Sequence, residues 1–561
     1  MPGVGVLRSY ERASLRPDLV AGIVLAAILV PQGMAYAQLA GLPAVTGLYT
    51  TIACLVGYAL FGPSRVLVLG PDSSISPLIL AAITPLLAGG SVSTAIALAG
   101  MLAIFVGLTE IGLGLGKLGF VADLLSKEVQ VGYMNGLAIT IIVGQLPKLF
   151  GFSTSADSFL KEVRVFFEGL DQTSSTTLLV GLAVLVLLLV LPRITRRVPA
   201  VLVAVVAATA ASAVFDLFSH GVDTVGSLPQ GVPSPSFPWT NAHDIGPLLV
   251  AAVGITLVSL TDTIATATSF AARRGDEVRP NQEMIGMGAA NIAAGLFQGF
   301  AVSTSGSRTA VAEQSGARSQ LSNLVGAGLV AVLLLFANSL LADLPQCALA
   351  AIVIVAALSL MDVALLRRYL EVRRSALAVS LVASAGVILL GVLQGIVVAV
   401  ALAILLFFRR NWWPHGAVLG RVDEVEGWHD VGAYPEAQQL PGVVVYRWEA
   451  PLFFANAGSF REQIRRLARE RKPSWIVLQC EAVTDVDVSA AEMLEQLDNE
   501  LNAEGIHLAF AELRTRLQEL TLRYGLMETL DRDHFYPTLE AALRAIADGS
   551  ATADADTRRA D

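Results

Sequence analysis

The stretch AVSTSGSRTAVAEQSGAR, residues 301–318, places small polar residues and an arginine between two long apolar segments. Such an interruption stands out in a chain of 561 residues that is 54% hydrophobic and only 15% charged. The mean hydropathy of +0.64 is too high for a soluble protein, and apolar runs recur at the ~20-residue length that a bilayer requires. The chain is therefore predicted to be a polytopic α-helical membrane protein, with this stretch inside its membrane region.

Apolar segments can be placed at fourteen positions, in two sets of seven. They cover residues 18–38, 44–61, 73–87, 95–115, 127–146, 176–191 and 198–216, then 246–270, 281–298, 304–316, 320–338, 345–361, 375–389 and 391–408. Two sets with an odd number of segments enter the membrane in opposite directions. This is the arithmetic of an inverted repeat, a common construction of secondary transporters.

The charges of the connecting loops test this count through the positive-inside rule. If Arg8, Arg12 and Arg16 are cytoplasmic, every even-numbered loop should also carry cations. Those loops hold Arg65, Lys117, Lys127, Arg193, Arg196, Arg197, Arg273, Arg274, Arg279, Arg318, Arg367, Arg368, Arg373 and Arg374. Among the odd-numbered loops, the long fifth one carries Lys148, Lys161 and Arg164. We expect both termini to be cytoplasmic, in a bacterial plasma membrane.

The third segment of each half differs from an ordinary span. Residues 69–80, LGPDSSISPLIL, and the opening stretch both begin with Gly, Ser or Pro and have a short apolar continuation. Irregular backbone inside hydrocarbon must face protein or a water-filled cavity, so we predict two half-helices that meet near the midplane. A helix start presents unpaired N–H groups and a partial positive charge, and two starts at one point form an anion site.

In the second half-helix, Ser305, Ser307 and the backbone around Gly306 would donate hydrogen bonds to an anion, and Arg308 would add a full charge. Glycine would permit close approach. The alternative is that these small polar residues only let helices pack closely, as they often do in membranes.

Asp262 lies well inside the eighth segment, where a carboxylate is expensive enough to suggest a function. Thr266 is one helical turn further on the same face. Together they would bind Na⁺, or Asp262 alone would carry a proton; the alternative is a structural pairing with Arg308. Asp72 is a second buried acid in the first half-helix. Gln32 follows Pro31 in the first span and either lines the same cavity or packs in a helix kink.

Long motifs in this chain resemble the SulP anion permeases, the sulfate permease family. The matching pieces are VPQGMAYAQLAGLP (30–43), GLYTTI (47–52), GPSRVLVLGP (62–71), NQEMIGMGAANIAAGLFQG (281–299) and STSGSRTAVAEQSGAR (303–318). The resemblance implies core and gate domains that move in an elevator-like way. It also implies an anion site that involves Gln32, Tyr36, Asp72, Ser73, Ser305, Ser307 and Arg308, with a coupling role for Asp262. Asp72 departs from the hydrophobic or small residue that the family often has there, which leaves the substrate open.

After residue 410 the chain becomes soluble in character, and strands alternate with helices. The segment VTDVDVSAAEMLEQL (483–497) resembles the STAS domain, which in this family follows the membrane domain. Val488 stands where STAS domains carry a phosphorylatable hydroxyl, so Ser489 is interpreted as a helix cap or a displaced phosphosite. The expected organisation is a cytosolic segment (1–17), a transmembrane domain (18–410), a linker (411–438), a STAS domain (439–547) and a disordered tail (548–561).

The sequence therefore predicts a secondary active transporter of inorganic oxyanions, most plausibly sulfate, coupled to H⁺ or Na⁺. Bicarbonate or a C4-dicarboxylate is the alternative substrate, and an anion sensor that signals through the STAS domain is the alternative class. The chain has no Walker A motif, and its three cysteines lack metal-ligand spacing, so we expect no ATP motor, no enzyme activity and no cofactor besides a coupling ion. The expected partners are the anion, membrane lipid, a second copy of the chain in a homodimer and a cytosolic protein at the STAS domain, but no nucleic acid.

Overall fold

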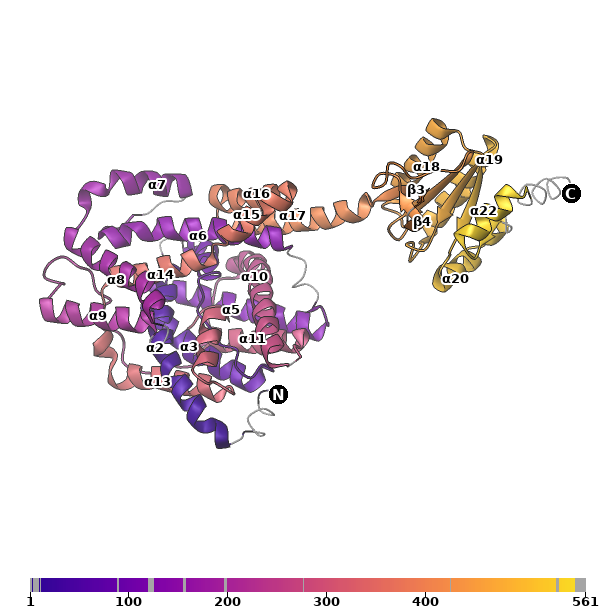
Figure 1. Ribbon diagram of the computed structural model, residues 1–561. Coiled ribbons are helices and arrows are strands. Elements are labelled where there is room, and N and C mark those ends of the chain that lie inside the picture. The colour runs from indigo at the N-terminus through magenta and orange to yellow at the C-terminus, as the bar shows by residue number, and fades with distance from the viewer. Residues whose placement is uncertain are drawn as a thin grey trace. The chain divides into compact units, whose positions relative to one another are not determined.

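The computed structural model describes residues 3, 10, 12–87, 90–119, 126–154, 158–195, 199–275, 277–423, 425–530 and 534–549, except the side chains of Arg274, Phe407, Arg410 and Glu528. It divides into two compact units, residues 1–403 and 404–561. The first unit is helical and the second contains a sheet covered by helices (Figure 1). Most of the expected N-terminal segment (1–17) and of the expected disordered tail (548–561) lies outside the described residues.

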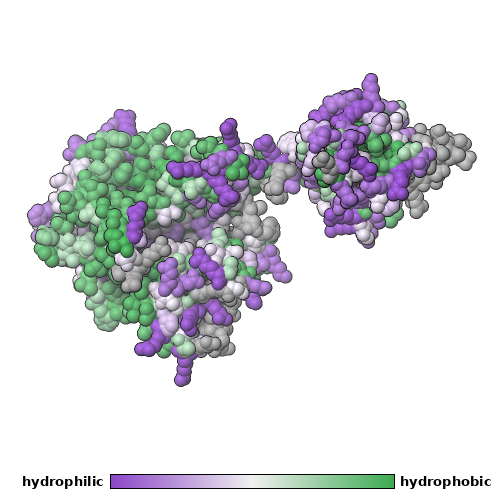
Figure 2. All heavy atoms as spheres, viewed as in Figure 1, coloured by the Kyte–Doolittle hydropathy of each residue, from purple (hydrophilic) through white to green (hydrophobic). Residues whose placement is uncertain are grey.

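Helices occupy each of the fourteen predicted spans. In the first half they are α2 (Leu15–Leu39), α3 (Ala44–Phe61), α4 (Ser76–Leu87), α5 (Val92–Leu115), α6 (Lys127–Phe150), α8 (Ser175–Ile194) and α9 (Ala200–Phe215). In the second half they are α10 (Ala242–Arg274), α11 (Pro280–Leu296), α12 (Gly306–Gln314), α13 (Leu321–Phe336), α14 (Gln346–Leu360), α16 (Arg374–Leu390) and α17 (Val392–Trp412). Within the described residues, seven helices are long and apolar enough to cross a membrane alone. Figure 2 shows apolar side chains over much of the outer face of the first unit, so the predicted polytopic membrane fold is confirmed.

The two halves match element by element. The third helix of each half is short: α4 has 12 residues and α12 has 9. At ~1.5 Å per residue these helices are about 18 and 14 Å long, roughly half of the ~30 Å hydrocarbon core. Two short strands precede them, β1 (Leu69–Gly70) and β2 (Ser303–Thr304), and they pair antiparallel. This pairing brings the two half-helix starts together.

Two further helices, α7 (Phe159–Glu168) and α15 (Val363–Val372), were not predicted. Each follows the fifth span of its half, so they also occupy equivalent positions in the repeat. In α7 the apolar residues lie on one face, as in FLKEVRVFFE. Their charged residues and short length explain why a search for apolar spans passes over them.

The packing of the helices divides the first unit into a core and a gate. In the core (α2–α5 and α10–α13), α5 packs against α11 and α3 packs against α13. In the gate (α6, α8, α9, α14, α16 and α17), α6 packs against α16 and α8 against α14. A Cβ atom on Gly107 of α5 would lie 2.5 Å from the carbonyl oxygen of Gly288 of α11, and the converse distance is also 2.5 Å. Small residues at this crossing therefore let the two halves of the core approach closely.

The second unit contains a six-stranded sheet of order β4-β3-β5-β6-β7-β8. The strands are β3 (Gly416–Val422), β4 (Val425–Asp430), β5 (Val443–Trp448), β6 (Trp475–Gln479), β7 (His507–Ala511) and β8 (Phe535–Tyr536). Helices α18 (Ala457–Arg471), α19 (Val488–Ala503) and α20 (Thr515–Arg523) cover one face, and α22 (Leu539–Ala547) covers the other. The segment 411–438, expected as a linker, carries β3 and β4, and β3 pairs with β5.

The start of α19 differs from the expected cap. Asp487, not Ser489, is the N-cap, and its carboxylate accepts hydrogen bonds from the backbone N–H groups of Ala490 (2.8 Å) and Phe454 (2.9 Å). Ser489 lies inside the first turn and is exposed. The aspartate prevails because its two carboxylate oxygens satisfy donors from two different segments at once.

Candidate anion-binding site

A cavity of about 660 Å³ lies in the first unit and is lined by residues of both core and gate. Nine predicted site residues line it: Gln32, Tyr36, Asp72, Ser73, Asp262, Thr266, Ser305, Gly306 and Ser307. They come from α2, from the two half-helix starts and from α10. Residues more than 270 positions apart in the chain therefore line one cavity.

The start of α12 opens onto this cavity. Ser305 is its N-cap, and the Ser305 side-chain oxygen accepts a hydrogen bond from the backbone N–H of Arg308 at 3.4 Å. Among the described residues, no hydrogen bond is recorded for the backbone N–H groups of Gly306 and Ser307. These groups are the donors that a helix start leaves for a ligand, and the helix dipole adds partial positive charge there. The arrangement is suited to an anion.

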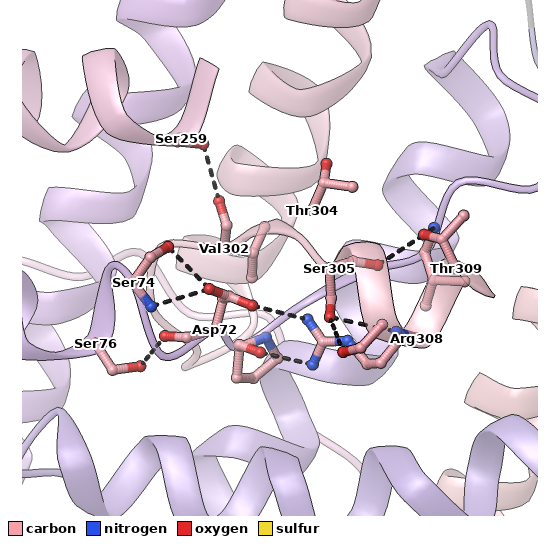
Figure 3. A network of polar contacts seen from close by, with 12 residues as sticks. Asp72, Ser74, Ser76, Ser259, Val302, Thr304, Ser305, Arg308 and Thr309 are labelled. Carbon is pink, nitrogen blue, oxygen red and sulfur yellow. Dashed lines mark hydrogen bonds and ion pairs between the residues drawn. The ribbon is translucent and has the colours of Figure 1, made fainter. Parts of the chain in front are cut away.

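Arg308 lies behind the cavity instead of lining it. Its side chain is 1% exposed, and its Nη1 donates a hydrogen bond to the carbonyl oxygen of Pro71 at 2.7 Å. Its Nη2 lies 3.8 Å from the Asp72 carboxylate. Figure 3 shows the two side chains pointing toward each other. The recorded ion pair of Arg308 is thus with Asp72, and the alternative that it pairs with Asp262 is not supported. Its charge acts on the cavity through space.

Asp72 occupies the start of the other half-helix. Its Oδ1 accepts hydrogen bonds from the backbone N–H (2.9 Å) and the hydroxyl (2.8 Å) of Ser74. The Ser76 hydroxyl donates to the Asp72 carbonyl oxygen at 2.7 Å (Figure 3). At the start of α4, the Asp72 carboxylate therefore already accepts a backbone hydrogen bond that a bound anion could otherwise accept. The two half-helix starts are chemically unequal, because the start of α4 carries an acidic side chain and the start of α12 does not.

Asp262 faces the same cavity from α10. Its side chain accepts a long hydrogen bond of 3.4 Å from Gln130 Nε2, across the boundary between core and gate. Thr266, one turn further along α10, comes close to α12, because a Cβ atom on Gly306 would lie 3.8 Å from the Thr266 hydroxyl. A carboxylate and a hydroxyl oxygen are suitable ligands for a hard cation. Asp262 and Thr266 are therefore suitable ligands for a coupling cation next to the start of α12.

Lys127 is a cavity residue that the sequence analysis did not assign to the site. It begins α6, is exposed and lines the cavity with Gln130 and with Asp362 of the gate. In the sequence, Lys127 counted only among the charges of the loops. A signal was available, since Lys127 is placed at the first position of a predicted span, with Gln130 on the same helical face.

These features define the class of the protein: a membrane transport protein built as an inverted repeat around a cavity, with a separate α/β domain. The model of the sulfate permease family matches residues 15–383, and the STAS domain model matches residues 434–542. The chain belongs to the sulfate permease family and carries a STAS domain. It is a membrane transport protein and not an enzyme.

Relatives with assigned names support the same family. A probable sulfate transporter of Mycobacterium tuberculosis is 43% identical, over 97% of each chain. The chloroplastic sulfate transporter 4.1 of Arabidopsis thaliana is 31% identical over 96% of this chain and 81% of its own length. Among solved structures, the murine anion transporter of solute carrier family 26, member A9, in an inward-facing state, has a TM-score of 0.87 at 24% identity, covering 97% of this chain and 93% of its own. The transmembrane domain of a cyanobacterial bicarbonate transporter has a TM-score of 0.62 at 24% identity, over 70% and 98%.

Proposed function

We propose that the protein is a secondary active transporter of inorganic oxyanions, that sulfate is its substrate, and that H⁺ or Na⁺ drives uptake. The observation that carries this proposal is the start of α12, where Gly306 and Ser307 line the cavity together with Asp262 and Thr266. Within the described part of the chain, no hydrogen bond is recorded for the backbone N–H groups of Gly306 and Ser307. The names of the curated relatives favour sulfate over bicarbonate or a dicarboxylate.

The charge of the cavity supports coupling. Three aspartates and one lysine line it, namely Asp72, Asp262, Asp362 and Lys127. Asp72 is balanced by Arg308, whereas among the described residues no ion pair is recorded for Asp262. A divalent anion near an unbalanced carboxylate is repelled, and the energy is large where water is scarce. A proton or Na⁺ on Asp262 would remove this repulsion, so cation and anion would enter together.

The cavities of the first unit support an inward-open state in an elevator-like cycle. Lys127 and Asp362 lie at the ends of membrane spans. The loop charges place these ends, and both termini of the chain, on the cytoplasmic side. A second cavity of about 550 Å³ is lined by residues of the opposite loops, including Gln38, Leu42 and Leu228. The core carries both half-helices, so its movement against the gate would carry the anion from one cavity toward the other.

The STAS domain is proposed to serve homodimer formation or the binding of a cytosolic protein. Two apolar side chains on neighbouring segments of this domain are exposed: Phe454 is 70% exposed and Val488 is 57% exposed. The backbone N–H of Phe454 bonds to Asp487, which directly precedes Val488. The molar mass of the solubilised protein, compared with that of Phe454→Ser/Val488→Ser, tests whether this patch holds a dimer together.

The proposed transport is tested with proteoliposomes that contain wild type, Asp262→Asn or Asp171→Asn. Asp171 is an exposed acid outside the cavity and serves as the control. Uptake of radiolabelled sulfate, bicarbonate and succinate is followed under imposed pH or Na⁺ gradients. We expect gradient-driven sulfate accumulation by wild type and Asp171→Asn, but not by Asp262→Asn. If well-folded wild type moves no anion under any gradient, the transport proposal fails and the anion-sensor alternative replaces it.

A further inference from the structure

Glu110 is a fully buried carboxyl in α5 that neither the anion site nor the coupling proposal uses. It is 0% exposed and does not line the cavity. Its Oε1 lies 3.2 Å from the hydroxyl of Ser259 on α10, and its Oε2 accepts a hydrogen bond from Asn291 Nδ2 on α11 at 2.9 Å. The carboxyl thus joins three core helices.

Both partners of Glu110 also hold the backbone of Val302. The Asn291 side-chain oxygen accepts a hydrogen bond from the Val302 N–H at 2.8 Å, and Asn291 Nδ2 lies 3.4 Å from the Val302 carbonyl oxygen. The Ser259 hydroxyl lies 3.5 Å from the same carbonyl oxygen (Figure 3). Val302 directly precedes β2, which leads into the start of α12. Glu110 is therefore connected, through two side chains, to the backbone that aims the anion donors.

The surroundings of Glu110 do not suit a charged carboxylate. Its partners are a neutral hydroxyl and a neutral amide, and among the described residues no ion pair includes it. Helices α4, α10 and α11 pack against α5; their described titratable or charged side chains are His243, Asp244, Asp262, Arg273 and Glu283, and α4 has none. Glu283 contacts Tyr58 and Ser64, and Asp262 faces the cavity. An unpaired carboxylate at this depth is far costlier than a carboxylic acid.

The protonated form completes the local hydrogen bonding. A Glu110 O–H group would donate to the Ser259 oxygen, and the Ser259 hydroxyl would then donate to the Val302 carbonyl oxygen. The second Glu110 oxygen keeps the hydrogen bond from Asn291. Each buried polar group then has a partner, as buried networks require.

We infer that Glu110 holds a proton throughout the transport cycle and is a positioning residue, which fixes Val302 and thereby the start of α12. Glu110 is thus distinct from Asp262, which gains and loses its cation in each cycle. The positioning role rests on the proposed transport function, whereas the bound proton does not.

Infrared spectroscopy of the purified full-length protein tests the proton without any transport assay. The difference spectrum between wild type and Glu110→Gln at pH 7.5 should contain the carbonyl band of a protonated carboxylic acid. Carboxylate bands in that difference spectrum would overturn the inference. The Asp262→Asn difference spectrum, recorded alongside, identifies the signal of the other buried acid.

Transport kinetics test the positioning role. Glutamine reproduces both hydrogen bonds of the protonated acid, so Glu110→Gln should keep the sulfate KM within about twofold and leave the pH profile unchanged. Glu110→Leu removes both bonds and should raise KM at least ~10-fold in protein that elutes as a single species. Loss of transport or a shifted pH profile in Glu110→Gln would overturn the inference. If wild type itself transports no anion, the transport proposal has failed, and the infrared result still decides whether the proton is present.

Discussion

At the scale of single residues, the cations around the cavity have different roles. Arg308 is buried and fixed by Pro71 and Asp72, whereas Lys127 is exposed at the cavity wall. The electrostatic attraction of an exposed lysine raises the concentration of anions near the cavity. Dissolved salt screens this attraction and weakens it.

Replacing Lys127 should therefore weaken anion capture without unfolding the protein. We predict that Lys127→Gln raises the sulfate KM by roughly fivefold at low ionic strength and by less at high salt, with little change in maximal rate. Initial rates of uptake at two salt concentrations measure this effect. Lys117→Gln, which removes an exposed lysine outside the cavity, is the matched control. An equal effect of both substitutions would show that only overall charge matters.

The three cysteines should be inert in the folded protein. Cys54, Cys347 and Cys480 are free and buried. Burial, together with the nearby Glu512 carboxylate, raises the pKa of the Cys480 thiol to about 12, so the reactive thiolate is scarce at pH 8. We predict no maleimide labelling of native protein at pH 8 and labelling of all three cysteines after denaturation, as mass spectrometry would show. Rapid labelling of Cys480 in native protein would contradict its buried placement.

Sequence patterns pointed to the polar interruptions and to Asp262 inside an apolar helix, but they did not single out Glu110. The Ser305, Gly306 and Ser307 cluster was found because polar residues at a span boundary are conspicuous. Glu110 was overlooked, although one acid within the span at 95–115 is itself a signal. Arg308 was expected at the anion, but whether a side chain points into a cavity or behind a strand depends on tertiary packing. Sequence alone does not give that direction.

At the scale of elements, the two half-helix starts are unequal because Asp72 occupies one of them. The account therefore assigns the anion to the α12 start. The space in front of Gly306 is limited by Thr266, at 3.8 Å from a Cβ atom built on this glycine. A side chain at this position would take up part of the space beside this helix start.

Gly306→Ala should consequently fold but bind sulfate less well. The added methyl group fits at van der Waals distance, yet it stands between the helix start and the anion. We predict a ~10-fold higher KM, equivalent to about 1.4 kcal/mol of binding free energy. The control is Gly328→Ala on α13, where a Cβ atom meets nothing within 4 Å. Unchanged sulfate KM in Gly306→Ala would argue against an anion at this helix start.

The membrane helices could be predicted because hydrocarbon thickness fixes their length and the alternation of loop charge supports their number. A search for long apolar segments does not detect α7 and α15, because these helices are short and charged. It also does not detect β3 and β4, because β3 is stabilised by pairing with β5, which lies further along the chain. The half-helices were recognisable because irregular backbone in a membrane must be sheltered by protein.

At the scale of the whole molecule, an elevator-like cycle requires the core to slide against the gate. Gly254 of the core faces Ile396 of the gate, with 3.6 Å between a Cβ atom on Gly254 and the Ile396 Cγ2. We predict that oxidation of Gly254→Cys/Ile396→Cys forms a disulfide that stops sulfate uptake, and that a reductant restores it.

A matched control lies within the gate. A Cβ atom on Gly181 of α8 would lie 3.4 Å from the Cβ of the native Cys347 on α14, close to disulfide geometry. Oxidised Gly181→Cys should transport normally, because both helices belong to the gate. Continued uptake by the fully crosslinked core-to-gate variant would contradict a sliding core.

The most direct test of the account is to locate a bound anion. A structure of the full-length protein in selenate, with the anomalous signal of selenium as the marker, would show where a sulfate-like anion binds. The account predicts one selenate within hydrogen-bonding distance of the Gly306 and Ser307 N–H groups, and none in Gly306→Leu. An ordered structure of the wild type with selenate bound elsewhere in the membrane unit, and the α12 start empty, would contradict it.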